Sequence, residues 1–156
     1  MYRPIAALAC ILFFAACGTN YEYHSTESIE DACWTYTDTI NFDFTIEDTS
    51  AIYTLYVDFD HTADYPYQNV YTKLYTRFPS GKRLSRVTSF NLFNNQGESN
   101  GKCSGDACNV HLILQENAFF SDPGNYTITL EQNMRKDSIR GIKAIGLAIE
   151  KTGKKG

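Results

Sequence analysis

Alternation of apolar and polar residues restricts the fold of this chain more than any other feature of its sequence. From Ile40 to Ile46, isoleucines and phenylalanines alternate with asparagine, aspartate and threonine, and the same two-residue period recurs over 53–59 and 70–78. Successive side chains of a β-strand point to opposite faces, so a strand with one buried face shows this period. The three segments are therefore predicted to be half-buried β-strands.

Further strands are predicted by shorter apolar patterns that lie between turn residues. Pro79-Ser80-Gly81 and Asp122-Pro123-Gly124 are typical turn sequences. The run 142–149 is apolar at both sets of alternating positions, which indicates a central strand covered on both faces. About seven or eight strands at this spacing predict an all-β fold, an antiparallel β-sandwich of immunoglobulin-like or jelly-roll-like type. The other predicted strands are 82–90, 110–114 and 126–130.

The first residues have the layout of a bacterial lipoprotein export signal. Arg3 supplies a positive charge, residues 5–16 form an apolar stretch, and two alanines precede Cys17. The stretch is too short to span a bilayer as a helix. A cysteine directly after the cleavage point is a lipid acceptor, so we expect the mature protein to begin at lipidated Cys17. The alternatives are an ordinary cleaved signal or a buried helix, and Cys10 has too short an apolar run before it to be the acceptor.

These features divide the chain into four predicted segments: a signal peptide over 1–16, a polar tether over 17–33, the sandwich domain over 34–152 and a basic tail over 153–156. Removal of the leader leaves 13 basic and 18 acidic residues, a net charge of −5. The tail lysines are the only basic cluster that we recognise in the sequence. Nucleic-acid binding is not expected, because contacts to phosphates need a basic surface.

The cysteines of the mature chain agree with an exported protein. Cys103 and Cys108 flank a short turn-like segment that contains glycine, and a disulfide across it is geometrically easy in an oxidising periplasm. The alternative is a metal site, but no second Cys/His pair has zinc-like spacing and His111 does not complete one. Cys33 is then the unpaired thiol, and we expect it to be buried beside Trp34.

Catalytic and cofactor motifs are not found, and we expect a non-catalytic protein without cofactor or metal. The three histidines are scattered, with His24 in the predicted tether, His61 in a predicted loop and His111 on a predicted strand. Asp58, Asp60 and Asp64 could bind calcium, but the spacing lacks the glycine and glutamate of an EF-hand, so a solvated loop end is the better interpretation. Glu116 and Asp122 are weak evidence for a glycosidase pair.

Two loops are candidate surfaces for partners. Tyr65-Pro66-Tyr67 places two tyrosines in a loop, where exposed rings bind sugars or proteins at low entropy cost. The alternative for a tyrosine in such a chain is to fill or flank the core of a sandwich. The stretch from Asn91 to Asp106 is polar, rich in glycine and asparagine, and longer than a hairpin needs, as functional or mobile loops often are.

Five segments, in this order, resemble the GldH family of gliding-motility lipoproteins, and the likeness extends from about Phe42 to Lys151. The leader and Cys17 occupy the places expected for the family. The Asn91–Asp106 loop is not matched to it. The segments are Tyr53-Thr-Leu-Tyr-Val, Asp64-Tyr-Pro-Tyr-Gln-Asn-Val-Tyr, Arg77-Phe-Pro-Ser-Gly-Lys, Pro123-Gly-Asn-Tyr-Thr-Ile-Thr-Leu-Glu-Gln-Asn-Met-Arg and Gly141-Ile-Lys-Ala-Ile-Gly-Leu-Ala-Ile-Glu-Lys.

The resemblance implies a non-catalytic lipoprotein of the outer membrane that acts with other envelope gliding lipoproteins and the associated secretion machinery. Non-gliding bacteria also carry members of this family. The residues after Cys17 lack the acidic run that often accompanies surface display, which favours the periplasmic face. A sheet edge or the two loops would bind partner proteins. The alternative function is a lipoprotein that binds carbohydrate or a nutrient, which an exposed coplanar aromatic pair would favour.

Overall fold

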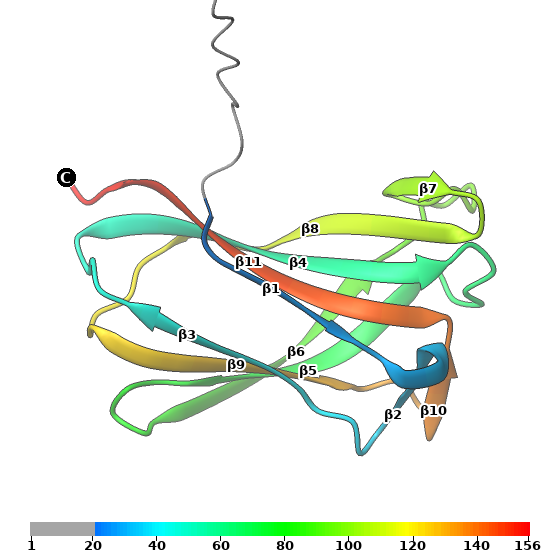
Figure 1. Ribbon diagram of the computed structural model, residues 1–156, viewed down its shortest axis with the longest axis horizontal. Helices are drawn as coiled ribbons and strands as arrows, with labels where there is room; N and C mark the ends of the chain where they lie inside the picture. Colours follow the sequence, from blue (N-terminus) through cyan, green and yellow to red (C-terminus); the bar gives the residue numbers. More distant parts are fainter. Residues whose placement is uncertain (1–20) are drawn as a thin grey trace, which may run out of the picture.

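Two antiparallel β-sheets, packed face to face, form the body of the computed structural model (Figure 1), which describes residues 21–156. The first sheet has the strand order β1-β11-β4-β8-β7 and the second the order β3-β9-β5-β6, while β2 and β10 form a separate ribbon. The strands are β1 (Tyr21–Ser28), β2 (Cys33–Thr35), β3 (Ile40–Ile46), β4 (Ala51–Thr62), β5 (Asn69–Arg77), β6 (Arg83–Asn91), β7 (Lys102–Ser104), β8 (Ala107–Ala118), β9 (Gly124–Gln132), β10 (Ser138–Arg140) and β11 (Ile142–Lys154), with a 3₁₀ turn η1 (Glu30–Ala32).

The predicted all-β antiparallel sandwich is confirmed, with eleven strands in the described residues rather than seven or eight. The additional strands include β2, β7 and β10, each three residues long, in which a two-residue period cannot be recognised. Within residues 21–156, no helix is long and apolar enough to cross a membrane.

The alternating sequence of β3 forms a strand because one face of it is covered. Its four apolar side chains are buried and its three polar side chains are exposed. The buried Phe44 stacks on Tyr126 of β9, with ring centroids 5.8 Å apart. On the exposed face, the hydroxyl of Thr129 donates a hydrogen bond to the side chain of Asn41 (2.7 Å). The same alternation thus supplies both the core and a ladder of polar cross-strand pairs.

The apolar run over 142–149 is the central strand that the sequence predicts. It forms most of β11, which pairs with β1 on one side and β4 on the other. Its outward-facing residues are small. At Gly146, a Cβ atom would lie 3.1 Å from the hydroxyl oxygen of Thr26 and from the Cβ of Asp58, so the side chains of the flanking strands close over this position.

Both ends of the predicted domain need correction. Residues 21–28 belong to β1 and pair with β11, so the prediction that the tether extends to Cys33 is wrong. The strand is polar because it is an edge strand, and this polarity made it look like a tether. At the other end β11 continues through Lys154, which pairs with Ala51, so the first half of the predicted basic tail is strand. Cys17 lies outside the described residues.

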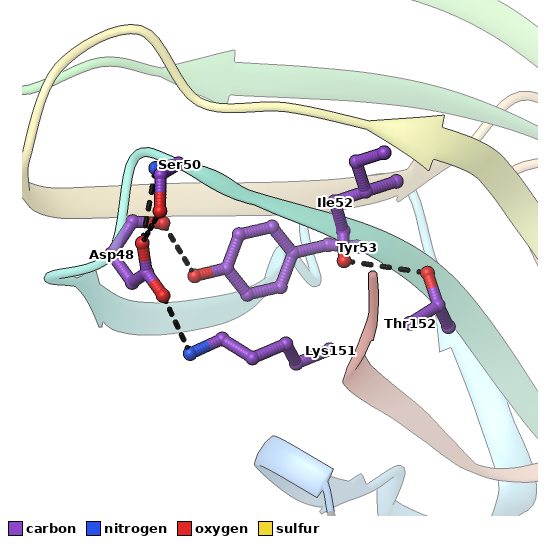
Figure 2. A network of polar contacts seen from close by, with 6 residues as sticks. All are labelled: Asp48, Ser50, Ile52, Tyr53, Lys151 and Thr152. Atoms are coloured by element: carbon purple, nitrogen blue, oxygen red, sulfur yellow. Dashed lines mark hydrogen bonds and ion pairs between the residues drawn. The ribbon is translucent and has the colours of Figure 1, made fainter. Parts of the chain in front are cut away.

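A polar network fixes the turn between β3 and β4 to the end of β11 (Figure 2). The Asp48 carboxylate accepts hydrogen bonds from Lys151 Nζ (2.8 Å) and from the amide and hydroxyl of Ser50 (3.0 and 2.6 Å). The Tyr53 hydroxyl donates to the Asp48 carbonyl oxygen (2.8 Å). The bonds from Lys151 and Ser50 hold the pKa of Asp48 well below its usual range, and the Asp48 carboxylate raises the pKa of Lys151. This network joins the two sheets at one end of the sandwich.

Candidate functional site

The Tyr65–Tyr67 loop connects β4 to β5, as predicted, but its first tyrosine is not an exposed platform. Tyr65 is only 5% exposed and belongs to the hydrophobic core, where its ring stacks on Phe93 and its hydroxyl donates to the Asn69 carbonyl (3.2 Å). Burial raises its pKa. Pro66 is exposed and Tyr67 half-buried, at the rim of a shallow hollow of about 340 Å³. For these two residues a partner-binding role stays a prediction.

The Asn91–Asp106 segment is held in place by contacts of its own. The Asn94 side chain accepts hydrogen bonds from the amides of Gln96 and Glu98 (both 2.9 Å), and Phe93 forms a bridge to Ser99. Beyond this turn the chain forms β7, which pairs with the start of β8. A disulfide joins Cys103 of β7 to Cys108 of β8, the pair expected from the sequence.

Cys33 is unpaired in the described part of the chain. It is half-buried rather than buried, because it begins the short ribbon strand β2 at one end of the sandwich, whereas the neighbouring Trp34 is fully buried. The expectation of a buried thiol is therefore wrong.

The histidines lie on strands, which corrects two of the three predicted positions. His24 is on β1, and His61 is on β4 with no exposed surface. His61 Nδ1 donates a hydrogen bond to the Thr62 carbonyl oxygen (2.8 Å), because a carbonyl oxygen can only accept. His61 Nε2 has no hydrogen-bond partner among residues 21–156. His111 on β8 bonds to Asp58 (2.6 Å) and stacks on Tyr56.

The acidic residues Asp58 and Asp60 are on β4 and not at a loop end, a further correction of the sequence interpretation. Both are hydrogen-bonded to residues of the neighbouring strand β8. Asp60 accepts a hydrogen bond from Asn109 (2.6 Å), and Asp58 is bonded to His111. Glu116 is on β8, and Asp122 lies in the loop before β9. No group of three His, Cys, Asp or Glu residues within 21–156 is arranged to hold a metal ion.

One side of the sandwich has two neighbouring strands with unpaired outer edges. In the described residues, β6 pairs with β5 on one side only, and β8 has β7 beside it only as far as Asn109. The edges face each other, because Arg86 of β6 donates a hydrogen bond from Nη2 to the Leu114 carbonyl of β8 (3.3 Å). We call this side, formed by β6 and by β8 from Val110 to Ala118, the open side.

An apolar cleft of about 410 Å³ lies between the two edges. Leu84 of β6 and Phe119, which follows β8, are 52% and 62% exposed at its mouth. Four of the six large hydrophobic side chains that are exposed within residues 21–156 lie on β6, on β8 or directly after it: Leu84, Val87, Ile113 and Phe119. Of these four, Leu84 and Phe119 line the cleft, whereas Val87 and Ile113 lie on the outer faces of the two sheets.

The β5–β6 hairpin is strongly basic, although its lysines and arginines do not form a continuous run in the sequence. No acidic residue occurs between Asp64 and Glu98, whereas five basic residues do. Lys73 and Arg83 both lie over the ring of Tyr75, each 5.1 Å from its centroid. The five basic residues are Lys73, Arg77, Lys82, Arg83 and Arg86.

Comparison with known proteins places the chain in a family. A sequence model of the GldH lipoprotein family matches residues 21–149. The chain is 29% identical over 149 residues to the gliding motility lipoprotein GldH homolog of Christiangramia forsetii, with 91% of each protein covered. It is 25% identical over 153 residues to the gliding motility lipoprotein GldH of Flavobacterium johnsoniae, with 94% of each covered.

Similar solved structures include two proteins, each with a TM-score of 0.40. One is the VP2 subviral particle of infectious bursal disease virus, 15% identical, of which the match covers 38%, against 96% of this chain. The other is a carbohydrate-binding module specific for non-crystalline cellulose, 10% identical, with 85% of this chain and 73% of the module covered. Neither likeness informs the function. The family match over nearly the whole described chain does, and this chain belongs to the GldH family of gliding-motility lipoproteins.

Proposed function

We propose that this protein is a lipid-anchored, non-catalytic interaction module that binds partner proteins of the gliding and associated secretion machinery. The observation that carries the proposal is the open side, where two unpaired strand edges border an apolar cleft in a protein of a gliding-motility family. The alternative, carbohydrate or nutrient binding, is weakened by the burial of Tyr65, because it depended on exposed rings at that loop.

Lipidation of Cys17 would hold the sandwich close to the outer membrane, on its periplasmic face. Since β1 begins at Tyr21, only three residues separate it from the acceptor cysteine. Even fully extended, the chain from Cys17 to Tyr21 spans at most about 14 Å. The anchored end is also the end that carries the Asp48–Lys151 network, because Tyr21 pairs with Glu150.

Metabolic labelling with palmitate, combined with cell fractionation, tests the anchor. We expect the wild-type protein to be labelled and to fractionate with outer membranes, and Cys17→Ser to lose both properties. Cys33→Ser is the matched control, because it removes a thiol that has no assigned role in anchoring. Unchanged labelling and fractionation of Cys17→Ser would contradict the proposed anchor.

Deletion of the gene in the source bacterium tests the function itself. We expect loss of surface spreading or of protein secretion, and co-purification of the tagged protein with other envelope lipoproteins. Complementation with the wild-type gene should restore the phenotype. A deletion strain with intact spreading and secretion, and a tagged protein that purifies alone, would contradict the proposed role.

A further inference from the structure

The geometry points to the outer edge of β6 as the acceptor for an extended strand of a partner protein, whose side chains alternate between apolar and acidic. We infer this binding mode from three independent features of the open side: the free backbone groups of β6, the apolar cleft beside it, and the charge of its hairpin. The inference deepens the proposed function, since it names the surface and the chemistry of the partner.

The backbone of β6 has hydrogen-bonding groups left for another strand. The Leu92 amide donates to the Gln68 carbonyl (2.9 Å), and the Phe78 amide donates to the Lys82 carbonyl (2.9 Å). Because hydrogen-bonded pairs alternate along an antiparallel ladder, the even-numbered residues of β6 direct their backbone amide and carbonyl groups toward β5. Ser85, Val87 and Ser89 therefore direct their amide and carbonyl groups outward. Added strands use such groups to extend an exposed sheet edge.

The cleft provides a place for alternate side chains of the added strand. Leu84, which projects from β6 toward the other sheet, lines the cleft together with Leu74 and Leu114. In a strand paired with β6, every second side chain would point to the same face as Leu84 and enter the cleft between β6 and β8. Apolar side chains at those positions would remove Leu84 and Phe119 from water, so one face of the partner strand should be apolar.

The positive charge of the β5–β6 hairpin favours acidic side chains on the other face of the partner strand. Residues 65–97 carry five basic and no acidic residues, whereas the rest of the mature chain carries 8 basic and 18 acidic residues. On the outer face of the sheet, an added strand would lie beside Val87 and near Arg83, so acidic side chains are favoured there, whereas Lys73 on β5 is already opposite Glu131 of β9. A second copy of this chain is disfavoured at this edge, because pairing β6 with β6 would juxtapose the basic residues of both copies.

Site-specific photo-crosslinking in cells of the source bacterium tests the inference. A benzoylphenylalanine is placed at Val87 on the free edge, at Leu84 in the cleft, and, as the matched control, at Thr45 on β3, the opposite edge of the same sheet. We expect an adduct of one defined mass at Val87 and Leu84 and none at Thr45. Peptide mapping should place the crosslink in a segment that alternates apolar and acidic residues.

A pair of variants shows whether the crosslinked adduct depends on backbone pairing with β6. Val87→Pro removes an outward-facing amide hydrogen, and proline is tolerated on an edge strand, whereas Val87→Thr keeps the amide. We expect the adduct from Leu84 to fall at least tenfold in Val87→Pro and to stay within twofold in Val87→Thr. Reversal of charge in Arg83→Glu, on the outer face of β6, should also reduce it at least fivefold. Thermal unfolding of each variant checks its fold, and Ser85→Pro replaces Val87→Pro if that variant does not fold.

Several outcomes would overturn the inference: no adduct at Val87 and Leu84, an adduct with lipid, an adduct with a basic or helical segment, or an adduct unaffected by the proline substitution.

These experiments distinguish failure of the proposed β6 binding site from failure of the proposed function. If a probe at Thr45 or Tyr67 captures a gliding lipoprotein while the β6 probes do not, the interaction role stands and the β6 edge is excluded. If the deletion strain spreads and secretes normally, the function itself is wrong.

Discussion

The two long sides of this sandwich both end in edge strands, but the contacts that join the two sheets differ between them. On each side the two sheets end in edge strands, β1 and β3 on one side and β6 and β8 on the other. The β1–β3 side is closed by aromatic contact between the sheets, since Tyr23 of β1 packs on Phe44 of β3 with ring centroids 5.5 Å apart. Burial raises the pKa of Tyr23 accordingly.

The β6–β8 side has a hydrogen bond where the other side has an aromatic contact. Arg86 reaches the Leu114 carbonyl, and the space beside this bond is the apolar cleft. The sandwich architecture does not require an open side, because on its other side the same two sheets are closed by the contact between two aromatic rings. The proposed partner strand would cover the apolar side chains that are exposed at this cleft.

Removal of a buried ring from the closed side should destabilise the protein most. Phe44→Ala should lower the free energy of unfolding by about 3–5 kcal/mol, because a buried phenylalanine is removed from contacts with Tyr23, Phe120 and Tyr126. Phe119→Ala, which truncates the same residue type on the open side, should cost no more than about 1 kcal/mol. Denaturant unfolding measures both, and equal losses would show that the open side is part of the structural core.

Much of the sandwich could be predicted from local pattern alone. Strands such as β3 and β5 bury one face, so their two-residue period is visible, and β11 is covered on both faces, so its apolar run is visible too. The disulfide could be predicted because Cys103 and Cys108 are close in sequence and flank a turn. Each of these features is encoded within a dozen neighbouring residues.

The open side could not be predicted, because its components are distant in sequence and its strands lack a clear pattern. Leu84 and Leu114 meet only in the folded chain, and most of β6 is exposed on both faces, so no buried period marks it. The burial of Tyr65 depends on Phe93, 28 residues away, for the same reason. The basic hairpin is visible in the sequence only as an interval without acidic residues, because its basic residues are separated by other residue types.

The short strand β7 covers the beginning of β8 and defines where the open edge starts. Replacing both Cys103 and Cys108 by serine should lower the free energy of unfolding by about 2 kcal/mol, since the disulfide closes a small ring. We also expect amide exchange of β8 to become faster at Asn109, the last residue that β7 pairs. Unchanged exchange there would mean that β7 covers β8 without help from the disulfide.

A smaller, pH-dependent effect is expected at the polar network that ties β3, an edge of the closed side, to β11. Because its hydrogen bonds hold the pKa of Asp48 below the usual value, the network stabilises the fold above about pH 4, and this stabilisation decreases as the pH falls below that value. Asp48→Asn should therefore unfold at a lower temperature than wild type at pH 7, with a difference that narrows on acidification. Lys151→Met is the matched variant from the partner side. A difference that grows at low pH would contradict this account.

Truncation of Leu84 at the cleft should change the stability of the protein least. Leu84 lines the cleft but is half exposed, so Leu84→Ala removes little buried surface, and the free energy of unfolding should change by no more than about 0.5 kcal/mol. Leu74, 5% exposed on the adjacent strand β5, is the matched control, and its substitution by alanine should cost about 2–5 kcal/mol. Unfolding of both variants in denaturant separates two explanations of the cleft. If Leu84→Ala costs as much as Leu74→Ala, then Leu84 is held by the fold itself, and its position at the mouth no longer points to a partner.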